Sequence, residues 1–174
     1  MKTSCLKNKN CLITGATGGV GKEVSIQLAG QSCNLFLTGR NKQKLESLKK
    51  LLSKNNPDIN IEYKEGDLTR LSDIKNIVTD AKHFFGNIDI LINCAGIFMI
   101  KPLFEYDIDD YFNCFNLNVR APFVLSKELV PDMIEKNWGR IINLGSSSSY
   151  MGFKYGSYYC STKFAILGLS RSLH

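Results

Sequence analysis

A tyrosine and a lysine four positions apart, Tyr159 and Lys163, open a segment whose apolar residues recur at helical spacing. Four-residue spacing brings two side chains together only on a helix. A lysine ammonium beside a phenol stabilises the phenolate, and such a tyrosine can act as a general acid or base. The pair therefore predicts proton transfer to or from an oxygen of a substrate.

The same spacing occurs a second time, at Tyr150 and Lys154. Gly152 and Gly156 lie inside and just beyond this second pair, which indicates a loop rather than a helix. In a loop the spacing implies no shared face, so we select Tyr159 as the general acid or base.

A run of serines, residues 146–149, follows an apolar segment that has the pattern of a strand. The ligand sites of open α/β sheets lie beyond the carboxyl ends of the strands, which favours Ser146, the first serine of the run. Its hydroxyl could hydrogen-bond a substrate oxygen and stabilise the charge that develops there. Ser147 is the alternative, and Ser148 and Ser149 are interpreted as loop residues.

The segment TGATGGVG at 14–21 lies between a strand pattern and a helical pattern. Its glycines at 15, 19 and 21 permit a tight turn and the close approach of a diphosphate to the backbone. The helix that follows supplies free N–H groups and a positive dipole end. In a chain with 14 glycines the spacing alone is weak evidence, but its place between strand and helix predicts a dinucleotide site.

The second apolar run ends Thr38-Gly39-Arg40, without a carboxylate. Enzymes selective for NAD usually place an acid here, which binds the ribose 2′-hydroxyl. The planar guanidinium of arginine suits a 2′-phosphate instead. Arg40 therefore favours NADP(H) over NAD(H), and the alternative is an ordinary surface charge.

Apolar runs alternate with helical patterns along the whole chain, and the runs themselves do not alternate with polar residues. Such strands, each followed by a helix, predict an α/β fold with a doubly wound parallel sheet covered on both faces. The expected strands span 11–14, 34–38, 59–63, 88–92 and 141–144. The expected helices span 20–29, 41–52, 71–85, 108–136 and 157–173, the fourth being broken near Asn116 and bent at Pro131.

The 174 residues, 44% of them hydrophobic and 22% charged, suit a single globular domain over 1–174. No apolar stretch is long enough for a membrane span, and the first ten residues contain no apolar region of the kind that would indicate secretion. The cysteines form no CxxC pair and no metal-ligand cluster, which predicts reduced thiols in the cytoplasm and no metal site. The net charge of +6 comes mostly from residues 40–54, where leucines at helical spacing indicate a solvated helix face rather than a nucleic-acid site.

Together these motifs resemble those of the classical short-chain dehydrogenase/reductase family, including its 3-oxoacyl-ACP reductase-like members. The resemblance spans nearly the whole chain in the family's order. It is carried by TGATGGVG at 14–21, Asp67-Leu68, Asn93-Cys94-Ala95-Gly96, Asn118-Val119-Arg120, Ser146 and Tyr159-Cys160-Ser161-Thr162-Lys163. The family commonly has a second Asn where this chain has Cys94, so one structural hydrogen bond is expected to be weakened.

The resemblance implies a Rossmann-type fold that transfers hydride between a nicotinamide cofactor and a carbonyl or alcohol. It implies that Lys163 binds the nicotinamide ribose and that Asn118 holds a water of a proton relay. It further implies that Asp67 contacts the adenine and that Asn93 stabilises the sheet near the adenine ribose. For Asn118 the alternative is a helix-interior residue satisfied by the backbone. The catalytic residues so implied are Ser146, Tyr159, Lys163 and Asn118. The cofactor-binding residues so implied are Gly15, Thr17, Gly19, Val20, Gly21, Arg40, Asp67, Asn93, Ala95, Gly96, Tyr159 and Lys163.

We therefore expect an NADP(H)-dependent oxidoreductase that acts on a small-molecule carbonyl or alcohol. The alternative is a non-catalytic NADP(H)-binding regulatory protein, or an inactive fragment. Members of the family continue into a sixth and a seventh strand and a substrate lid, so the resemblance implies a five-stranded chain truncated at its C-terminus. It also implies a homodimer or homotetramer, paired through the helix after Asn118 and the helix of Tyr159. No nucleic-acid or membrane partner is expected.

Overall fold

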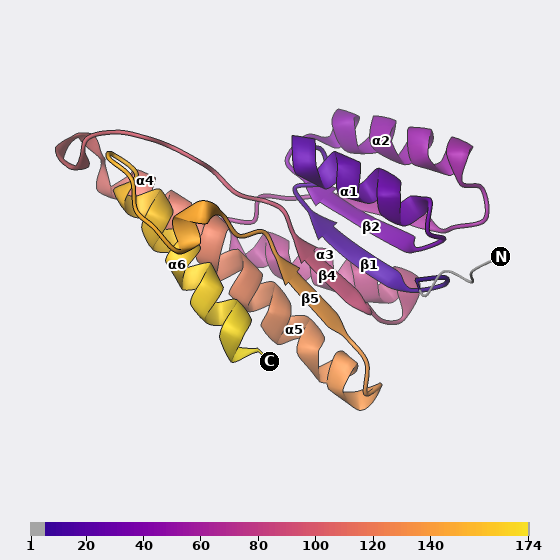
Figure 1. Cartoon of the computed structure of the whole chain (residues 1–174). Coiled ribbons are helices and arrows are strands. Elements are labelled where there is room, and N and C mark those ends of the chain that lie inside the picture. The colour runs from indigo at the N-terminus through magenta and orange to yellow at the C-terminus, as the bar shows by residue number, and fades with distance from the viewer. Residues whose placement is uncertain (1–5, 174) are drawn as a thin grey trace.

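The structure is a computed structural model and describes residues 6–173. Its centre is one sheet of five parallel strands. The strand order is β3-β2-β1-β4-β5, so the direction of winding reverses between β1 and β4 (Figure 1). The strands are β1 (Asn10–Thr14), β2 (Asn34–Gly39), β3 (Ile61–Glu65), β4 (Ile90–Asn93) and β5 (Arg140–Asn143). The predicted doubly wound parallel α/β sheet is confirmed.

Helices connect the strands and lie on both sides of the sheet (Figure 1). The α-helices are α1 (Gly19–Ala29), α2 (Lys42–Asn55), α3 (Leu71–Phe85), α4 (Ile108–Phe115), α5 (Ala121–Glu135) and α6 (Ser157–Ser172). The other helical segments are the 3₁₀ turns η1 (Leu103–Glu105) and η3 (Ser147–Ser149) and the π-helical turn η2 (Asn116–Arg120). No helix among residues 6–173 is long and apolar enough to cross a membrane.

Successive side chains of the central strands enter two separate cores, one on each face of the sheet. The first core includes Cys11, Ile13, Leu35, Leu37, Leu45, Leu48 and Leu52, from β1, β2 and α2. The second includes Leu12, Phe36, Leu91, Ile74, Ile77, Leu125 and Leu129, from three strands, α3 and α5. Because both faces of the central strands β1, β2 and β4 are buried, these strands are mostly apolar, and each large side chain buried there contributes about 1.5–3 kcal/mol.

The third strand begins and ends two residues later than predicted, at Ile61 and Glu65. Pairing with β2 starts where Leu35 lies opposite Ile61, and the turn after Pro57 continues until then. Ile59 still packs against the first core, which is why the apolar pattern placed it in the strand. Burial and strand pairing are thus separate properties, and only burial is visible in the pattern.

The long helical region does not break near Asn116 as predicted but widens into the π-helical turn η2. Pro131 lies inside α5, and α5 continues through it to Glu135. Proline has no N–H to donate, so the carbonyl four residues earlier loses one helical hydrogen bond. One such loss is tolerated here because α5 is held by its buried face, which includes Leu125 and Leu129.

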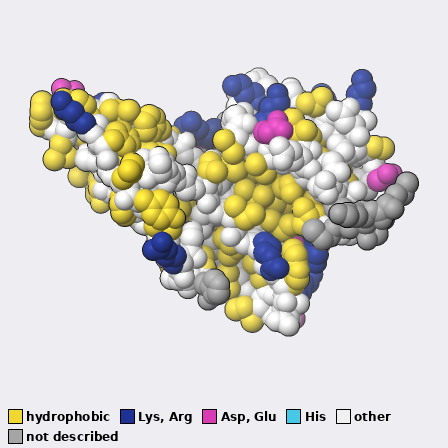
Figure 2. Space-filling view, viewed as in Figure 1, with side chains coloured by type: hydrophobic (Ala, Val, Ile, Leu, Met, Phe, Trp, Pro, Cys, Tyr) yellow, Lys and Arg dark blue, Asp and Glu magenta, His cyan; other side chains and the backbone are white. Residues whose placement is uncertain are grey.

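The strand β5 is an edge of the sheet and pairs only with β4 among the described residues. Its side chains are partly exposed, and Ile142 keeps 51% of its surface accessible. Figure 2 shows hydrophobic side chains in the middle of this view and at the end of the molecule where α4 and α6 lie. Leu103 and Phe104, in the turn η1 that precedes α4, are exposed by 73% and 88%.

Candidate active site

In the loop between β1 and α1, two glycines are required because a Cβ would collide with the backbone, and a third glycine is not required for folding. Gly15 has a φ of +61°, and a Cβ there would lie 2.8 Å from the backbone of Ala95. A Cβ on Gly21 would collide with the carbonyl of Gly15. A Cβ on Gly19 would meet no protein atom within 4 Å. Gly19 therefore leaves an open space against the start of α1.

The start of α1 has free hydrogen-bond donors that face this space. No side chain caps the helix at Gly18, and its first turn holds no acidic residue. Its first N–H groups and the positive end of its dipole are therefore available to an anion. Thr17 lies in the loop beside Gly39, and Val20 is half exposed. The loop thus has the open space and the free donors that the diphosphate of a dinucleotide needs, and the binding of one by Gly19, Val20 and Gly21 stays a prediction.

A cleft of about 630 Å³ opens from this loop across the carboxyl ends of the strands, at the point where the winding reverses. Open α/β sheets bind their ligands at this place. Of the residues predicted to bind the cofactor, Gly15, Thr17, Arg40, Asp67, Ala95 and Gly96 line the cleft. The cleft ends before Ser146, Tyr159 and Lys163, which lie beyond its lining.

Asp67 stands in a tight turn after β3 and is held from several sides. One carboxylate oxygen accepts hydrogen bonds from the N–H and the hydroxyl of Thr69, at 2.9 and 2.8 Å. Partial burial raises the pKa of Asp67, but these hydrogen bonds and the charges of Arg70 and Arg40 outweigh it and lower the pKa. Asp67 therefore keeps its negative charge at the rim of the cleft.

Asn93 is buried at the end of β4, and its amide joins two strands. The amide nitrogen donates to the side-chain oxygen of Asn143 at 2.8 Å, and the amide oxygen has no partner. Asn93 thus ties β4 to β5, as expected for a residue that stabilises the sheet, and it does not itself line the cleft. Next to it, the N–H of Ala95 donates to Thr14, which connects this loop to the end of β1.

Tyr159 and Lys163 share one face of α6. The ammonium of Lys163 lies 5.7 Å from the centre of the Tyr159 ring, and it donates to the carbonyl of Leu144 at 2.6 Å. Phe98 packs edge-on against the Tyr159 ring, with centres 4.7 Å apart. Lys163 is buried and Tyr159 half-buried. The helix therefore brings together the phenol and the ammonium that the four-residue spacing predicted.

The surroundings of Lys163 are unusual for an ammonium group. Burial lowers its pKa, and the nearby thiols of Cys114 and Cys94 act in the opposite direction. In turn, burial raises the pKa of the Cys94 thiol, and the charge of Lys163 partly offsets that rise. The hydrogen bond to Leu144 fixes the ammonium at the carboxyl end of β5.

Ser146 caps the 3₁₀ turn η3 just after β5. Its hydroxyl oxygen accepts a hydrogen bond from the N–H of Ser148 at 3.1 Å, so its own hydrogen stays free to donate to a ligand. The N–H of Ser146 donates to the hydroxyl of Ser149 at 3.3 Å. Ser148 and Ser149 lie in the connection between β5 and α6, as interpreted, but they are buried and bonded to Ser146. They hold Ser146 in place.

Asn118 is buried in the π-helical turn and binds the backbone of the loop after β4. Its side-chain oxygen accepts from the N–H of Ile97 at 2.9 Å, and its amide nitrogen donates to the carbonyl of Ile97 at 3.0 Å. The amide nitrogen also donates to the hydroxyl of Thr162 on α6. It donates to the sulfur of Cys114 as well, at 3.4 Å, one turn earlier along the helical segment. The side chain is thus fully engaged, both by the distant loop after β4 and by its own helical segment.

The second tyrosine–lysine pair is not brought together. Tyr150 lies exposed at the end of η3, and the ammonium of Lys154 lies 4.7 Å from the ring of Tyr155. The sequence analysis missed Tyr106, whose hydroxyl accepts from the N–H of Lys101 at 2.7 Å and lies 3.0 Å from the carbonyl of Tyr155. It joins the loops after β4 and β5, and no local motif marks a contact between such distant segments.

Comparison with protein families decides the class of this site. The family model described as short chain dehydrogenase matches residues 9–174. The chain belongs to this family. The short-chain dehydrogenases use nicotinamide cofactors, so the chain is that of an NAD(P)-dependent dehydrogenase or reductase, and the family expected from the sequence is confirmed.

Among curated relatives, an uncharacterized oxidoreductase of Staphylococcus aureus (strain MRSA252) is 27% identical over 168 residues. An uncharacterized oxidoreductase of Staphylococcus saprophyticus is 28% identical over the same length. Each match covers 97% of this chain and 71% of the relative. The chain therefore matches about seven tenths of the length of these relatives.

Two solved structures that are similar to this chain contain a bound cofactor. A metagenomic short-chain oxidoreductase in complex with NADP superposes with a TM-score of 0.92 at 25% identity, covering 97% of this chain and 76% of the other. A blue fluorescent protein from a metagenomic library, in complex with NADPH, has a TM-score of 0.90 at 31% identity, covering 97% and 68%.

Proposed function

We propose that Tyr159, Ser146 and Lys163 catalyse the interconversion of a small-molecule carbonyl and its alcohol with NADP(H). The observation that supports this most is the position of the Lys163 ammonium. It lies on the same face of α6 as Tyr159, and it donates a hydrogen bond to the carbonyl of Leu144, which follows β5. Ser146 follows β5 directly. Three groups that a carbonyl reduction needs, an acid, a cation and a hydroxyl donor, therefore stand at one end of one strand.

In reduction, the bound cofactor would supply hydride to the carbonyl carbon. Tyr159 gives its phenolic proton to the carbonyl oxygen, so that the C=O double bond becomes C–O–H and the tyrosine is left as phenolate. Ser146 donates its free O–H to the same oxygen and stabilises the charge that develops on it. The Lys163 ammonium stabilises the phenolate, which then takes a proton from solvent. In oxidation each proton moves in reverse.

We place Asn118 in the path of that returning proton through its backbone rather than its side chain. The side chain is occupied by Ile97 and Thr162. In an α-helical pattern the Asn118 carbonyl would accept from the residue four positions later, but that residue is Pro122, which has no N–H. In the π-helical turn Phe123 takes the place of that donor, but a carbonyl oxygen has two lone pairs, so we propose that it also accepts a hydrogen bond from a water of the relay from Lys163.

NADP(H) is the proposed cofactor, in preference to NAD(H). Arg40 lines the cleft at the end of β2 and is exposed. The strand β2 itself contains no carboxylate. The solved relatives bound to NADP and NADPH are consistent with this choice. Asp67, which lines the same cleft, would meet the adenine.

We also propose that copies of this chain pair through α5 and α6 as a homodimer or homotetramer. Phe123 on α5 and Phe164 on α6 are exposed by 53% and 47%, so neither belongs to the core. The described cysteines, which are Cys11, Cys33, Cys94, Cys114 and Cys160, are free, which fits a reducing compartment such as the cytoplasm; Cys5 lies outside the described residues.

The test is the variant Tyr159→Phe, with Tyr158→Phe as its matched neighbour. Oxidation of NADPH is followed with a panel of 3-oxoacyl thioesters, aldehydes and small ketones. Tyr159→Phe should abolish turnover and leave NADPH binding nearly unchanged, since the phenyl ring keeps its packing against Phe98. Tyr158→Phe should keep the wild-type rate. An undiminished rate in Tyr159→Phe would contradict the role of Tyr159 as the general acid.

A further inference from the structure

The loops after β4 and after β5 meet at the end of the molecule where α4 and α6 lie (Figure 1). In the first loop, the N–H of Lys101 donates to the hydroxyl of Tyr106 at 2.7 Å and to the carbonyl of Tyr155 in the second loop at 3.2 Å. The Tyr106 hydroxyl lies 3.0 Å from that same carbonyl, and the Tyr106 ring packs edge-on against Tyr158 on α6. Tyr106 therefore joins both loops to the helix that carries Tyr159.

Each of these loops carries an aromatic side chain close to the proposed general acid. The rings of Phe98 and Phe153 have centres 6.2 Å apart and planes inclined by 39°. Phe98 also meets the Tyr159 ring edge-on, with centres 4.7 Å apart. Residues 6–173 leave 59% of Phe98 and 41% of Phe153 uncovered. An apolar surface therefore begins at the ring of the proposed general acid.

The position of this surface relates it to the substrate. A carbonyl oxygen that takes the proton of Tyr159 must lie within hydrogen-bond distance of its hydroxyl. The substituents of that carbonyl then lie beside the Tyr159 ring, which Phe98 contacts. Covering an apolar surface is favourable in water, and aromatic rings gain further from edge-on or offset packing against other rings. Phe98 and Phe153 therefore favour an aromatic substituent.

Both cations on the two loops, Lys101 and Lys154, already have partners. Lys101 forms an ion pair with Asp110 at 2.9 Å. The ammonium of Lys154 lies 4.7 Å from the centre of the Tyr155 ring. An anionic group next to the carbonyl would have to draw one of these cations away from its partner, whereas an uncharged ring would disturb neither.

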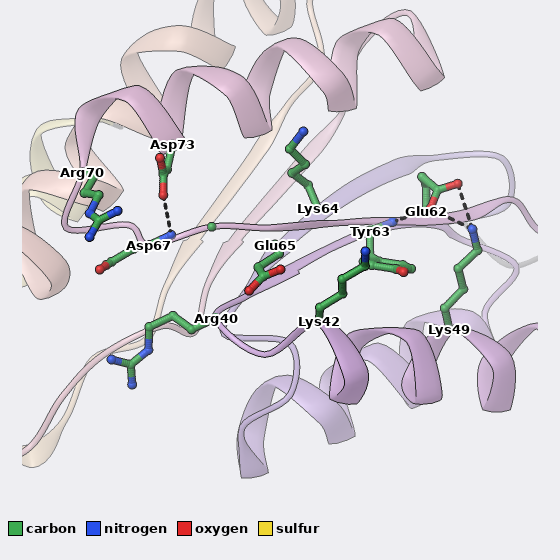
Figure 3. A pocket seen from close by; sticks show the side chains of 11 residues that line it. Arg40, Lys42, Lys49, Glu62, Tyr63, Lys64, Glu65, Asp67, Arg70 and Asp73 are labelled. Atoms are coloured by element: carbon green, nitrogen blue, oxygen red, sulfur yellow. Dashed lines mark hydrogen bonds and ion pairs between the residues drawn. The ribbon is translucent and has the colours of Figure 1, made fainter.

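The cleft of about 820 Å³ that runs along β3 has the opposite character (Figure 3). Tyr63 is the only aromatic residue in its lining. The lining side chains that form no ion pair among residues 6–173 balance in sign, with Arg40, Lys42 and Arg70 against Glu65, Asp67 and Asp73. This cleft favours neither an anion nor a cation, and the aromatic surface beside the site is that of Phe98 and Phe153.

We propose that Phe98 and Phe153 are specificity-determining residues, and that the substrate is an aldehyde or ketone with an aromatic ring on the carbonyl carbon. This inference rests on the proposed function and adds the class of substrate to it. The substrate ring packs against Phe98 and Phe153 while the carbonyl oxygen faces Tyr159. The product is the corresponding benzylic alcohol, with the hydride on the carbonyl carbon and the Tyr159 proton on the oxygen.

The experiment compares kcat/KM with NADPH for acetone, cyclohexyl methyl ketone, acetophenone and pyruvate. The unmodified protein should prefer acetophenone to the other three. Phe98→Ala and Phe153→Ala should each lower kcat/KM for acetophenone by roughly tenfold and change that for acetone by less than about twofold. Phe98→Leu keeps apolar area without a ring and should fall between. Phe104→Ala is the matched control and should act like the unmodified protein, since Phe104 is 88% exposed in η1 on the same loop as Phe98.

Binding without turnover separates this inference from the proposed function. Acetophenone is titrated into the complex with NADP⁺, which cannot reduce it, and its contact with the protein is followed by saturation-transfer NMR. Tighter binding to the unmodified protein than to Phe98→Ala supports the aromatic site. If acetophenone binds in this way but no ketone is turned over, the proposed function fails and the aromatic site stands.

Three results overturn the inference. Equal loss of kcat/KM for all four compounds in Phe98→Ala assigns Phe98 to the orientation of Tyr159 and not to specificity. Equal kcat/KM for cyclohexyl methyl ketone and acetophenone shows selection for size and not for an aromatic ring. A preference for pyruvate shows that a cation of the loops binds an anionic substituent. In each of these cases a carbonyl is still reduced with NADPH, so the proposed function stands.

Discussion

Tyr158 and Tyr159 are neighbours on α6, but their side chains have different surroundings. Tyr159 faces Lys163 and is half-buried. Tyr158 is 5% exposed, packs edge-on against Tyr106 with centres 4.1 Å apart, and its hydroxyl has no hydrogen-bond partner. Burial, aided by the proximity of Cys114, raises the pKa of Tyr158 to about 12. The two phenols should therefore respond oppositely to removal of the hydroxyl.

Tyr158→Phe should raise the free energy of unfolding by about 1 kcal/mol at neutral pH, because it removes a buried hydroxyl without a partner. The unfolded phenol loses its proton near pH 10 and the folded one near pH 12. Wild-type stability should therefore fall as the pH rises from 10 to 12, and the variant should lose less. Urea unfolding across this range measures the difference. A less stable variant at neutral pH would mean that the hydroxyl does have a partner.

At the scale of single residues, the sequence predicted the contacts that follow from helical geometry alone. The spacing of Tyr159 and Lys163 fixes a shared face, and the structure has it. The spacing could not show that the side chain of Asn118 binds Ile97, because this contact joins segments that only the folded sheet brings together. Nor could it show that Ser149 supports Ser146, since a serine run gives no sign of which hydroxyl accepts.

At the scale of elements, the strand–loop–helix unit of β1 and α1 separates folding from binding. Gly19→Ala should leave stability unchanged or raise it by about 0.5–1 kcal/mol, because its Cβ meets no protein atom within 4 Å and alanine favours helices. The same Cβ fills the space kept for the diphosphate, so NADPH binding should weaken by about tenfold or more. Thermal unfolding and NADPH titration together test the pair of effects.

Gly21→Ala is the control for Gly19→Ala, because it is expected to lower stability, which Gly19→Ala leaves intact. Its Cβ would collide with the carbonyl of Gly15, so the turn must shift and stability should fall by about 1–3 kcal/mol. The interpretation of the loop fails if Gly19→Ala binds NADPH as well as the wild type, or if the two variants are equally destabilised.

The elements that the sequence predicted well are those whose ends carry a local signal. α1 begins at its glycines, and α3 spans Leu71–Phe85 as its apolar spacing indicated. α2 continues past the predicted end at residue 52 to Asn55, because its last turn is solvated and lysine and asparagine leave no apolar mark. The π-helical turn η2 was also not visible, since its widening depends on packing against other segments.

At the scale of the whole molecule, β5 is a sheet edge that residues 6–173 leave without a second partner strand. An uncovered strand presents unpaired N–H and C=O groups to other strands and invites pairing between copies. Here the edge also presents Ile142 and Leu144, exposed by 51% and 39%. Such an edge associates without a defined end point, whereas pairing through Phe123 and Phe164 would stop at a fixed stoichiometry.

Ile142→Lys should therefore suppress concentration-dependent association and leave any discrete dimer intact, because a charge on an edge strand opposes pairing. Ile26→Lys is the matched control, since Ile26 is 38% exposed on α1, away from the edge. Light scattering over a dilution series should show fewer large species for Ile142→Lys and no change for Ile26→Lys. Association that persists equally in both variants would show that β5 is not its cause, and the exposed face of α5 and α6 would then carry it.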